Sequence, residues 1–270
     1  MEKLQAALDT ARKTRSGVPK GRIATATSRR IAPGDGESLS VLWRELAPFD
    51  VDNSLLETNR IVSRAANSAA APFDILRTKA ILQMRQHGWK RLAITSPMPS
   101  SGKTTMACNL ALGLGRQRDL RAILFDLDLR DPSVHEVLQV RPQASIGRVM
   151  SGEVDFADQA MRFGDNIAVS MAQHAEVDPA RLLLAEETAH VLDEIEARYR
   201  PDLMIFDLPS MLVNDDTRAF LKNADCALIV ARANTTRYAQ FDTCEREITE
   251  QTNVLGVVLN AYRHAGKGGD

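Results

Sequence analysis

The sequence predicts a three-layer α/β domain in which helices cover both faces of a mostly parallel central sheet. From Lys90 onward, short runs rich in leucine and β-branched residues alternate with longer segments of helical periodicity. This alternation is typical of parallel strands that are joined by helices. The first of these strands runs into a loop of small residues and then a helix, which is the usual setting of a phosphate-binding loop. Ligands of such domains bind at the carboxyl ends of the strands, so functional residues are expected there.

The elements of this domain are predicted from the apolar pattern. Strands are expected near 91–96, 121–127, 167–171, 202–207, 226–232 and 254–260. Helices are expected near 103–117, 133–139, 154–162, 179–199, 216–223 and 237–251. A further helix is predicted from Phe73 to His87, because apolar residues recur there at helical spacing and Gly88 follows.

The first 58 residues are expected to form a helical and flexible N-terminal segment. Residues 2–13 favour a short amphipathic helix, and residues 12–30 contain seven Lys or Arg and no acid. That composition is typical of a solvated linker. Contact with anionic lipid is the alternative, whereas the lack of interleaved aromatic residues disfavours nucleic acid. Apolar residues between 39 and 63 could pack on the main domain, which is predicted over 59–262, with a flexible tail at 263–270.

Composition narrows the class of protein. The chain has 270 residues, 44% of them hydrophobic, with 34 basic and 35 acidic side chains, enough to bury one sizeable core. No apolar run approaches the roughly 20 residues of a membrane-spanning helix, and the first 20 residues lack an apolar signal segment. We therefore expect a cytoplasmic protein. The three cysteines are far apart and none lies near a histidine at ligand spacing, so neither disulfides nor zinc are indicated.

Residues 96–105, Ser-Pro-Met-Pro-Ser-Ser-Gly-Lys-Thr-Thr, form the candidate phosphate-binding loop. The N-terminus of the following helix offers unpaired N–H groups and partial positive charge, and Lys103 adds a full charge. The Thr104 hydroxyl is a candidate ligand of Mg²⁺. Pro97 stands where the usual pattern has glycine, and Pro99 removes an amide donor. The donors are therefore expected from Ser100, Ser101, Gly102, Lys103, Thr104 and Thr105.

Three aspartates follow predicted strands. Asp126 and Asp128 end the second strand, where alternate residues point the same way, and Asp207 ends the fourth. These carboxylates would repel one another unless Mg²⁺ and a lysine lie beside them. They can act as direct or water-mediated metal ligands, or one can accept a proton from an attacking hydroxyl. In the structural alternatives, Asp126 caps the next helix and Asp207 braces a turn.

With these motifs in register, the sequence resembles the bacterial tyrosine kinases of capsule and exopolysaccharide synthesis. The resemblance is carried by the loop at 96–104, Asp-x-Asp-x-Arg at 126–130 and Asp207-x-Pro209. It runs from about residue 59 to 262 and includes 147–153, 179–183, Asp216, 224–225 and 256–260. Related chromosome-partitioning and division-site ATPases usually have proline-glutamine at the position of Arg130, and a lysine at that of Met98.

The resemblance implies a P-loop NTPase fold with ATP and Mg²⁺ as cofactors. Lys103 and Thr104 would serve the phosphates and Mg²⁺, and Asn260 the adenine. The metal would be held by Thr104, Asp126, Asp128 and Asp207, and catalysis would rest on Lys103, Asp126 and Asp128. Arg130 is placed with the nucleotide-binding residues.

The resemblance also implies transfer of the ATP γ-phosphate to a protein tyrosine. The implied partners are a membrane polysaccharide co-polymerase or adaptor, which could hold the chain at the inner membrane, a tyrosine-bearing protein, and further copies of the chain. No nucleic acid is expected. Two features depart from the family. Tyr262 is the only tyrosine near the C-terminus, where the family has a cluster. The family's Glu-x-x-Arg-x-x-Arg oligomer motif reads Ala71, Asp74 and Arg77 here.

These departures leave two alternatives to a kinase. One is a nucleotide-gated scaffold that binds ATP and regulates a polysaccharide-export membrane protein without phosphorylating anything. The other is a membrane- or DNA-positioning ATPase, which the absence of lysine at position 98 disfavours.

Overall fold

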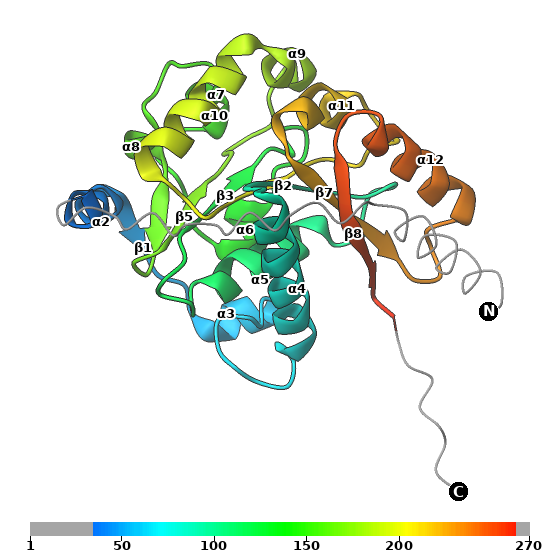
Figure 1. The fold of residues 1–270 in the computed structure, drawn as a ribbon, viewed down its shortest axis with the longest axis horizontal. Coiled ribbons are helices and arrows are strands. Elements are labelled where there is room, and N and C mark those ends of the chain that lie inside the picture. The colour runs from blue at the N-terminus through cyan, green and yellow to red at the C-terminus, as the bar shows by residue number, and fades with distance from the viewer. Residues whose placement is uncertain (1–34, 263–270) are drawn as a thin grey trace, which may run out of the picture. The chain divides into compact units, whose positions relative to one another are not determined.

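The computed structural model describes residues 35–262, with side chains from residue 38 onward. One eight-stranded sheet has the order β1-β4-β5-β3-β6-β2-β7-β8 (Figure 1). All neighbouring strands are parallel except β4 and β5, which are antiparallel. The predicted α/β class with a mostly parallel sheet is confirmed.

The bounds of the elements follow the chain. The strands are β1 (Ala47–Phe49), β2 (Arg91–Thr95), β3 (Ala122–Asp126), β4 (Met161–Phe163), β5 (Ile167–Ser170), β6 (Leu203–Asp207), β7 (Cys226–Arg232) and β8 (Asn253–Asn260). The longer helices are α2 (Asp35–Glu45), α4 (Ala71–His87), α5 (Lys103–Leu114), α10 (Glu186–Tyr199) and α12 (Tyr238–Thr249). The shorter ones are α3 (Asn53–Thr58), α6 (Val134–Leu138), α7 (Ile146–Met150), α8 (Phe156–Gln159), α9 (Pro179–Leu184), α11 (Asp216–Phe220) and the 3₁₀ turn η2 (Leu221–Asn223).

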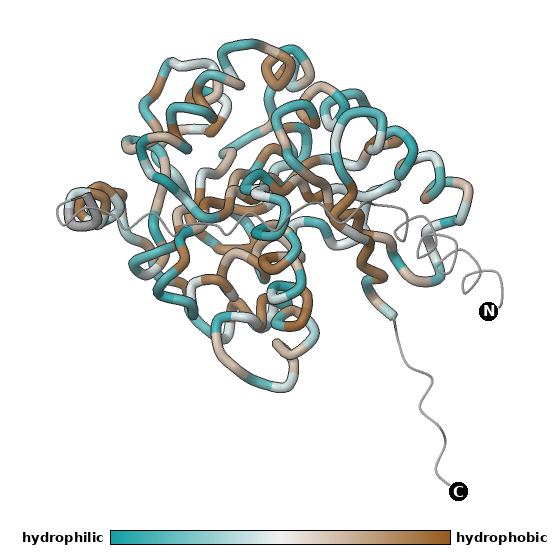
Figure 2. Tube along the Cα trace, in the orientation of Figure 1, coloured by the Kyte–Doolittle hydropathy of each residue, from teal (hydrophilic) through white to brown (hydrophobic). Residues whose placement is uncertain are grey.

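Two apolar clusters lie on opposite faces of the sheet. Successive residues of one strand point to opposite faces, so Ile123 joins one cluster and Leu124 the other. The central strands β2, β3 and β6 are almost entirely buried, which explains their continuous apolar runs. Figure 2 shows these apolar strands in the interior, with polar residues spread over the helices around them. The helices that cover both faces complete the three layers.

Several predicted elements differ from those observed. The helix expected at 154–162 is limited to α8, and β4 follows it. The helix expected at 179–199 is two helices, because Ala185 between them has an extended backbone (φ −60°, ψ 144°). The short elements β1, β4 and α7 were not expected.

Residues 37–58 belong to the compact unit, although the sequence places them in the N-terminal segment while allowing the apolar residues from 39 onward to pack on the main domain. The compact unit begins at Glu37, because β1 pairs with β4 and α2 buries Trp43. The Trp43 side chain is 1% exposed, and its indole N–H donates a 2.9 Å hydrogen bond to the carbonyl of Tyr199. The predicted N-terminal helix, basic linker and C-terminal tail lie outside the described residues. Among residues 35–262, no helix combines the length and apolar character needed to cross a bilayer.

Candidate nucleotide site

The candidate phosphate-binding loop joins β2 to α5 at the carboxyl edge of the sheet (Figure 1). α5 begins at Lys103, directly after Gly102, whose backbone is left-handed (φ 88°, ψ 31°). A Cβ at position 102 would overlap the side-chain amide nitrogen of Asn260. The backbone conformation therefore favours glycine there, and any larger residue would displace the Asn260 side chain. Ser100 also has a positive φ of 58°.

The loop is held by two of its own serine side chains and by side chains from the ends of β7 and β8. The Ser96 and Ser101 hydroxyls each donate to the carbonyl of Met98 over 2.8 Å. From the end of β8, Asn260 Nδ2 donates to the Ser101 carbonyl over 2.8 Å. From the end of β7, Arg232 Nη1 donates to the Ser100 carbonyl over 2.6 Å. Side-chain hydrogen bonds to the carbonyls of Met98, Ser100 and Ser101 therefore fix the conformation of the loop.

The aspartates that the sequence singled out are brought together beside this loop. Asp126 and Asp207 are register partners at the ends of β3 and β6, and both are completely buried. One Asp126 oxygen, Oδ2, accepts the backbone N–H of Val134 over 3.1 Å, so Asp126 also caps α6. Its other oxygen and both oxygens of Asp207 accept no well-aligned hydrogen bond from a described residue, although the Thr104 hydroxyl lies near enough to Asp207 to lower its pKa.

Burial and mutual repulsion raise the pKa of these carboxyl groups. The pKa of Asp126 lies well above its ordinary value because of burial first and then the nearby Asp207 and Asp128. Burial raises the pKa of Asp207 to about 7, against the opposing effect of Lys103. The pKa of Asp128 is also raised by burial, while Lys103 again lowers it. Ionising these three carboxyl groups together is therefore unfavourable in the protein alone, and a bound cation would favour their ionised forms.

Lys103 lies between the aspartates and a buried hydroxyl. Its Nζ is 3.6 Å from Asp128 Oδ2 and 3.5 Å from Ser210 Oγ. The Ser210 hydroxyl is in turn 3.1 Å from that of Ser96 in the loop. Sequence reasoning identified Lys103 and Asp128 but missed Ser210 and Arg232. Ser210 follows Asp207 by three residues and Arg232 ends a strand, so the rule of strand ends could have found both.

The residues present fit a bound Mg²⁺ with phosphates. The fit rests on the buried Asp126 and Asp207 oxygens, which have no well-aligned hydrogen-bond donor among the described residues, and on the Thr104 hydroxyl beside Asp207. Thr104, in the first turn of α5, places its hydroxyl 3.0 Å from that of Ser133. Residues 38–262 contain no group of three or more His, Cys, Asp or Glu side chains that could bind a metal ion by themselves. Mg²⁺ does not require one, because it usually takes one or two carboxylates together with phosphate oxygens and water.

Arg130 makes a different contact from the one expected. Its guanidinium forms two hydrogen bonds to the Asp216 carboxylate, Nε to Oδ2 over 2.6 Å and Nη2 to Oδ1 over 2.9 Å. Asp216 is completely buried, whereas the Arg130 side chain is 46% exposed. This pair ties the segment after β3 to the start of α11. Arg130 is therefore engaged within the protein, and its predicted contact with nucleotide stays a prediction.

The remaining predicted residues are placed around the same helix. Thr105 is half-buried in α5, and its carbonyl accepts from the Asn109 side chain over 2.8 Å. On α4, Asp74 pairs with Arg77 and with Arg116. Arg77 also donates to the Gly113 carbonyl over 3.0 Å. Asp74 and Arg77, two of the three residues at the oligomer-motif positions, thus form their contacts within this chain.

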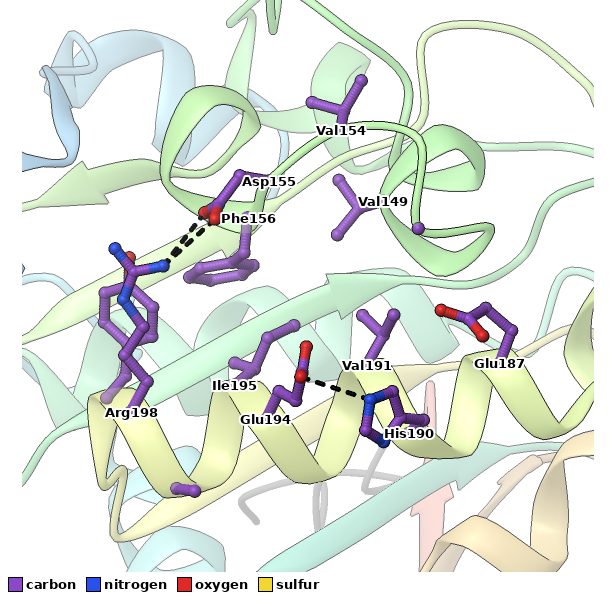
Figure 3. A pocket seen from close by; sticks show the side chains of 13 residues that line it. Val149, Val154, Asp155, Phe156, Glu187, His190, Val191, Glu194, Ile195 and Arg198 are labelled. Atoms are coloured by element: carbon purple, nitrogen blue, oxygen red, sulfur yellow. Dashed lines mark hydrogen bonds and ion pairs between the residues drawn. The ribbon is translucent and has the colours of Figure 1, made fainter.

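A separate cavity of about 810 Å³ lies between α10 and the segment 149–156 (Figure 3). Its rim carries an ion pair between Arg198 and Asp155 at 3.1 Å and a contact of 3.2 Å between His190 Nε2 and Glu194 Oε1. None of the predicted site residues lines it.

Comparisons with known proteins agree with this geometry. No family model matches the chain. The tyrosine-protein kinase etk of Escherichia coli is 27% identical over 202 residues, which cover 74% of this chain. The chain is a relative of the bacterial tyrosine-kinase domain. A second bacterial tyrosine kinase, YwqD of Bacillus subtilis, is 27% identical over 194 residues, 71% of this chain and 80% of YwqD.

Solved structures support the same fold. The kinase domain of Escherichia coli tyrosine kinase ETK matches with a TM-score of 0.68 and 24% identity, over 76% of this chain and 80% of that one. The cell division ATPase MinD of Pyrococcus furiosus matches with a TM-score of 0.53 and 22% identity, over 65% of this chain and 74% of MinD. This relative of the tyrosine-kinase domain therefore has a P-loop NTPase fold.

The extent of the match limits what carries over. The aligned region is only 27% of the length of the etk kinase, so that whole protein contains much that this match does not reach. Among the P-loop structures, a cobyrinic acid a,c-diamide synthase from Mycobacterium smegmatis was solved with an ATP analog and magnesium. It matches with a TM-score of 0.53 and 21% identity, over 63% of this chain and 72% of that one.

Proposed function

We propose that the chain binds ATP with Mg²⁺ at the loop 100–105 and transfers the γ-phosphate to a tyrosine of a protein. The observation that carries the proposal is the placement of Lys103 against Asp128, beside the buried pair Asp126 and Asp207. A lysine and several carboxylates at the N-terminus of a helix are the groups that phosphoryl transfer requires. Kinase relatives cover most of this chain, which makes tyrosine the favoured acceptor.

The roles of the residues follow from their surroundings. Backbone N–H groups at the start of α5 would bind the phosphates, and Lys103 would turn from Asp128 toward them. Asp207, Asp126 and Thr104 would hold Mg²⁺, which neutralises phosphate charge when it is bound. Asp128 is the better candidate to accept the proton of the tyrosine hydroxyl, because Asp126 caps α6 through its Oδ2. Ser96 and Ser210 would keep Lys103 in reach of both positions.

We further propose that the chain acts in exopolysaccharide or capsule synthesis with a membrane co-polymerase or adaptor. This rests on the resemblance of the motifs to kinases of that process. Because the described residues include no membrane-spanning helix, such a partner would bring the kinase to the membrane.

A nucleotide-gated scaffold is the second candidate, and Tyr262 favours it. It is the only tyrosine after Tyr238, so the chain offers few acceptors of its own near the C-terminus. A scaffold would need ATP binding but no proton acceptor. Asp128→Asn therefore separates the two candidates, because it should abolish transfer and leave ATP-dependent partner binding intact.

The direct test is phosphotyrosine formation by purified protein. The full chain is incubated with Mg-ATP and candidate partner proteins, and phosphotyrosine is located by mass spectrometry. Lys103→Met should abolish the signal, while Lys79→Met, which removes an exposed lysine of α4, should leave it unchanged. Labelling by Lys103→Met equal to that of the wild type would overturn the kinase proposal.

A further inference from the structure

A second recess lies at the amino edge of the sheet, opposite the phosphate-binding loop. It has a volume of about 640 Å³ and is lined by three arginines, Arg44, Arg118 and Arg121. These arginines come from three separate segments, the last turn of α2, the turn after α5 and the residue before β3. The turn between β4 and β5, with Gly164 and Asn166, completes the wall. The volume is within the range of small-molecule sites.

One of the three arginines is fixed in place. Arg121 Nη2 donates to Ser40 Oγ over 2.8 Å, and its guanidinium lies 5.8 Å from the centre of the Trp43 ring. Both contacts come from α2. They orient the guanidinium but do not neutralise it, because neither a hydroxyl nor an aromatic ring carries a negative charge. The Asp202 carboxylate, which accepts the Arg121 backbone N–H, offsets part of that charge.

The other two arginines are uncompensated. Neither Arg44 nor Arg118 makes a hydrogen bond or ion pair with any residue in the described part of the chain. Asp165 is the one acidic residue among those that line the recess. Its side chain is 95% exposed, and its nearest basic partner is Arg162, at 3.9 Å. The recess therefore gathers three arginines against one carboxylate in its lining, Asp165, and a second one, Asp202, that accepts the backbone N–H of Arg121 over 2.8 Å.

Such an arrangement favours a particular class of ligand. Like charges in a concave surface focus a positive potential that attracts anions. The planar guanidinium matches the oxygen geometry of phosphate and can bind it through two parallel hydrogen bonds. A carboxylate would suit one arginine, whereas a phosphate ester with several oxygens can engage three.

We infer that Arg44, Arg118 and Arg121 form a binding site for a phosphate-bearing ligand, distinct from the ATP site. The phosphate could belong to a soluble ester or to a lipid headgroup, since the same chemistry would recognise both. The inference is independent of the kinase proposal. α5 connects the two places, because it starts at Lys103 and ends next to Gly115, which lines the recess. Its 12 residues span about 18 Å at 1.5 Å per residue.

The test uses the full chain carrying Lys103→Met, which weakens phosphate binding at the loop, in buffer with EDTA. Inorganic pyrophosphate is titrated in by calorimetry. In a second arm, the protein is sedimented with phosphatidylcholine vesicles that contain, or lack, phosphatidic acid. Arg44→Gln and Arg118→Gln should each weaken binding about tenfold in whichever arm is positive, the effect of losing one charged hydrogen bond. Because neither arginine has a partner in the described chain, both variants should fold.

Lys79→Gln is the matched control, since it removes one positive charge from the exposed face of α4. Pyrophosphate binding that depends on the arginines identifies a soluble ester, and arginine-dependent binding to phosphatidic acid identifies a headgroup. The inference is overturned if neither probe binds, or if Lys79→Gln weakens binding as much as the arginine variants do. The inference is also overturned if both arginine variants leave binding unchanged in every arm that is positive; for vesicles, the basic segment 12–30 would then account for the binding.

Discussion

The side-chain amide of Asn260 donates a 2.8 Å hydrogen bond to the carbonyl of Ser101. Its Oδ1 accepts the backbone N–H of Ala261 over 2.8 Å, so both ends of the amide are engaged within the chain. The last strand is thereby tied to the phosphate-binding loop. An amide nitrogen has two hydrogens, so the predicted contact of Asn260 with adenine would have to use the second one.

Gly102→Ala is expected to reduce ATP affinity strongly. The new methyl group meets Asn260 Nδ2, and the backbone must keep a φ of 88°, which costs a residue with a Cβ about 1–2 kcal/mol. Gly88→Ala is the matched control, because Gly88 has a φ of 72° with nothing near its Cβ position. It should lower stability and leave ATP binding, measured by calorimetry, unchanged. Equal loss of ATP affinity in both variants would contradict the proposed role of the loop.

Asn260→Gly in the Gly102→Ala background tests the two causes separately. It removes the side chain that the methyl group meets but leaves the backbone strain. We expect partial recovery of ATP affinity. Asn260→Gly alone gives the cost of losing the hydrogen bond to the Ser101 carbonyl. No recovery after that cost is subtracted would mean that strain alone accounts for the loss.

Arg130→Gln should destabilise the protein more than Asp216→Asn. Without Arg130, the carboxylate of the completely buried Asp216 loses its charged partner, which we expect to cost about 1–3 kcal/mol. Asn at position 216 removes the charge itself, and the half-exposed Arg130 can be solvated. Urea denaturation measures both free energies of unfolding. The reverse order would show that Asp216 is stabilised by something other than Arg130.

Asp207→Asn should become more stabilising as the pH rises in metal-free buffer. The folded-state pKa of Asp207 is about 7, above the ordinary value of 3.8, so the native protein binds this proton more tightly than the unfolded chain does. The free energy of unfolding therefore falls as pH increases from about 4 to 7, by at most about 1.4 kcal/mol per pH unit. The variant lacks this loss, and it also relieves Asp126, whose pKa Asp207 raises.

Urea denaturation in EDTA at pH 5, 6, 7 and 8 measures that difference. The gap between the variant and the wild type should widen up to pH 7 and then level off. A gap that is constant with pH would show that Asp207 is ionised throughout.

Trp43→Phe should lower the free energy of unfolding by about 1–3 kcal/mol, because the carbonyl of Tyr199 loses its donor in a buried place. Trp43→Ala should lower it further, by about 3–5 kcal/mol, since it also leaves a cavity. Val41→Ala on the same helix changes a residue that is 45% exposed and should cost less than about 0.5 kcal/mol. Thermal and urea unfolding provide the measurements.

The parts of the fold that the sequence predicted are those with a strong local signal. The six predicted strands were expected because each is an apolar run. Five of them, β2, β3, β5, β6 and β7, are almost entirely buried, and parallel strands that are buried on both faces require such runs. β1 and β4 have three residues each, too few for any periodicity. The break at Ala185 interrupts an otherwise helical pattern, and no glycine or proline marks it.

The candidate site shows the same division. Gly102, Lys103 and Thr104 are adjacent in the sequence, so their motif could be recognised directly. The partner of Arg130 lies 86 residues away, and its identity depends on how the strands are ordered. Sequence analysis could therefore name Arg130 as important without finding Asp216 as its partner.

The burial of Trp43 bears on how this protein is shortened for experiments. A version that started at residue 59 would lack β1 and the tryptophan side chain, both of which belong to the folded unit. It would expose the apolar surface that Trp43 covers, including Tyr199, and leave the edge of β4 unpaired. Exposed sheet edges beside apolar surface promote aggregation. Poor solubility of such a fragment would reflect the choice of starting residue and would say nothing about the stability of the intact chain.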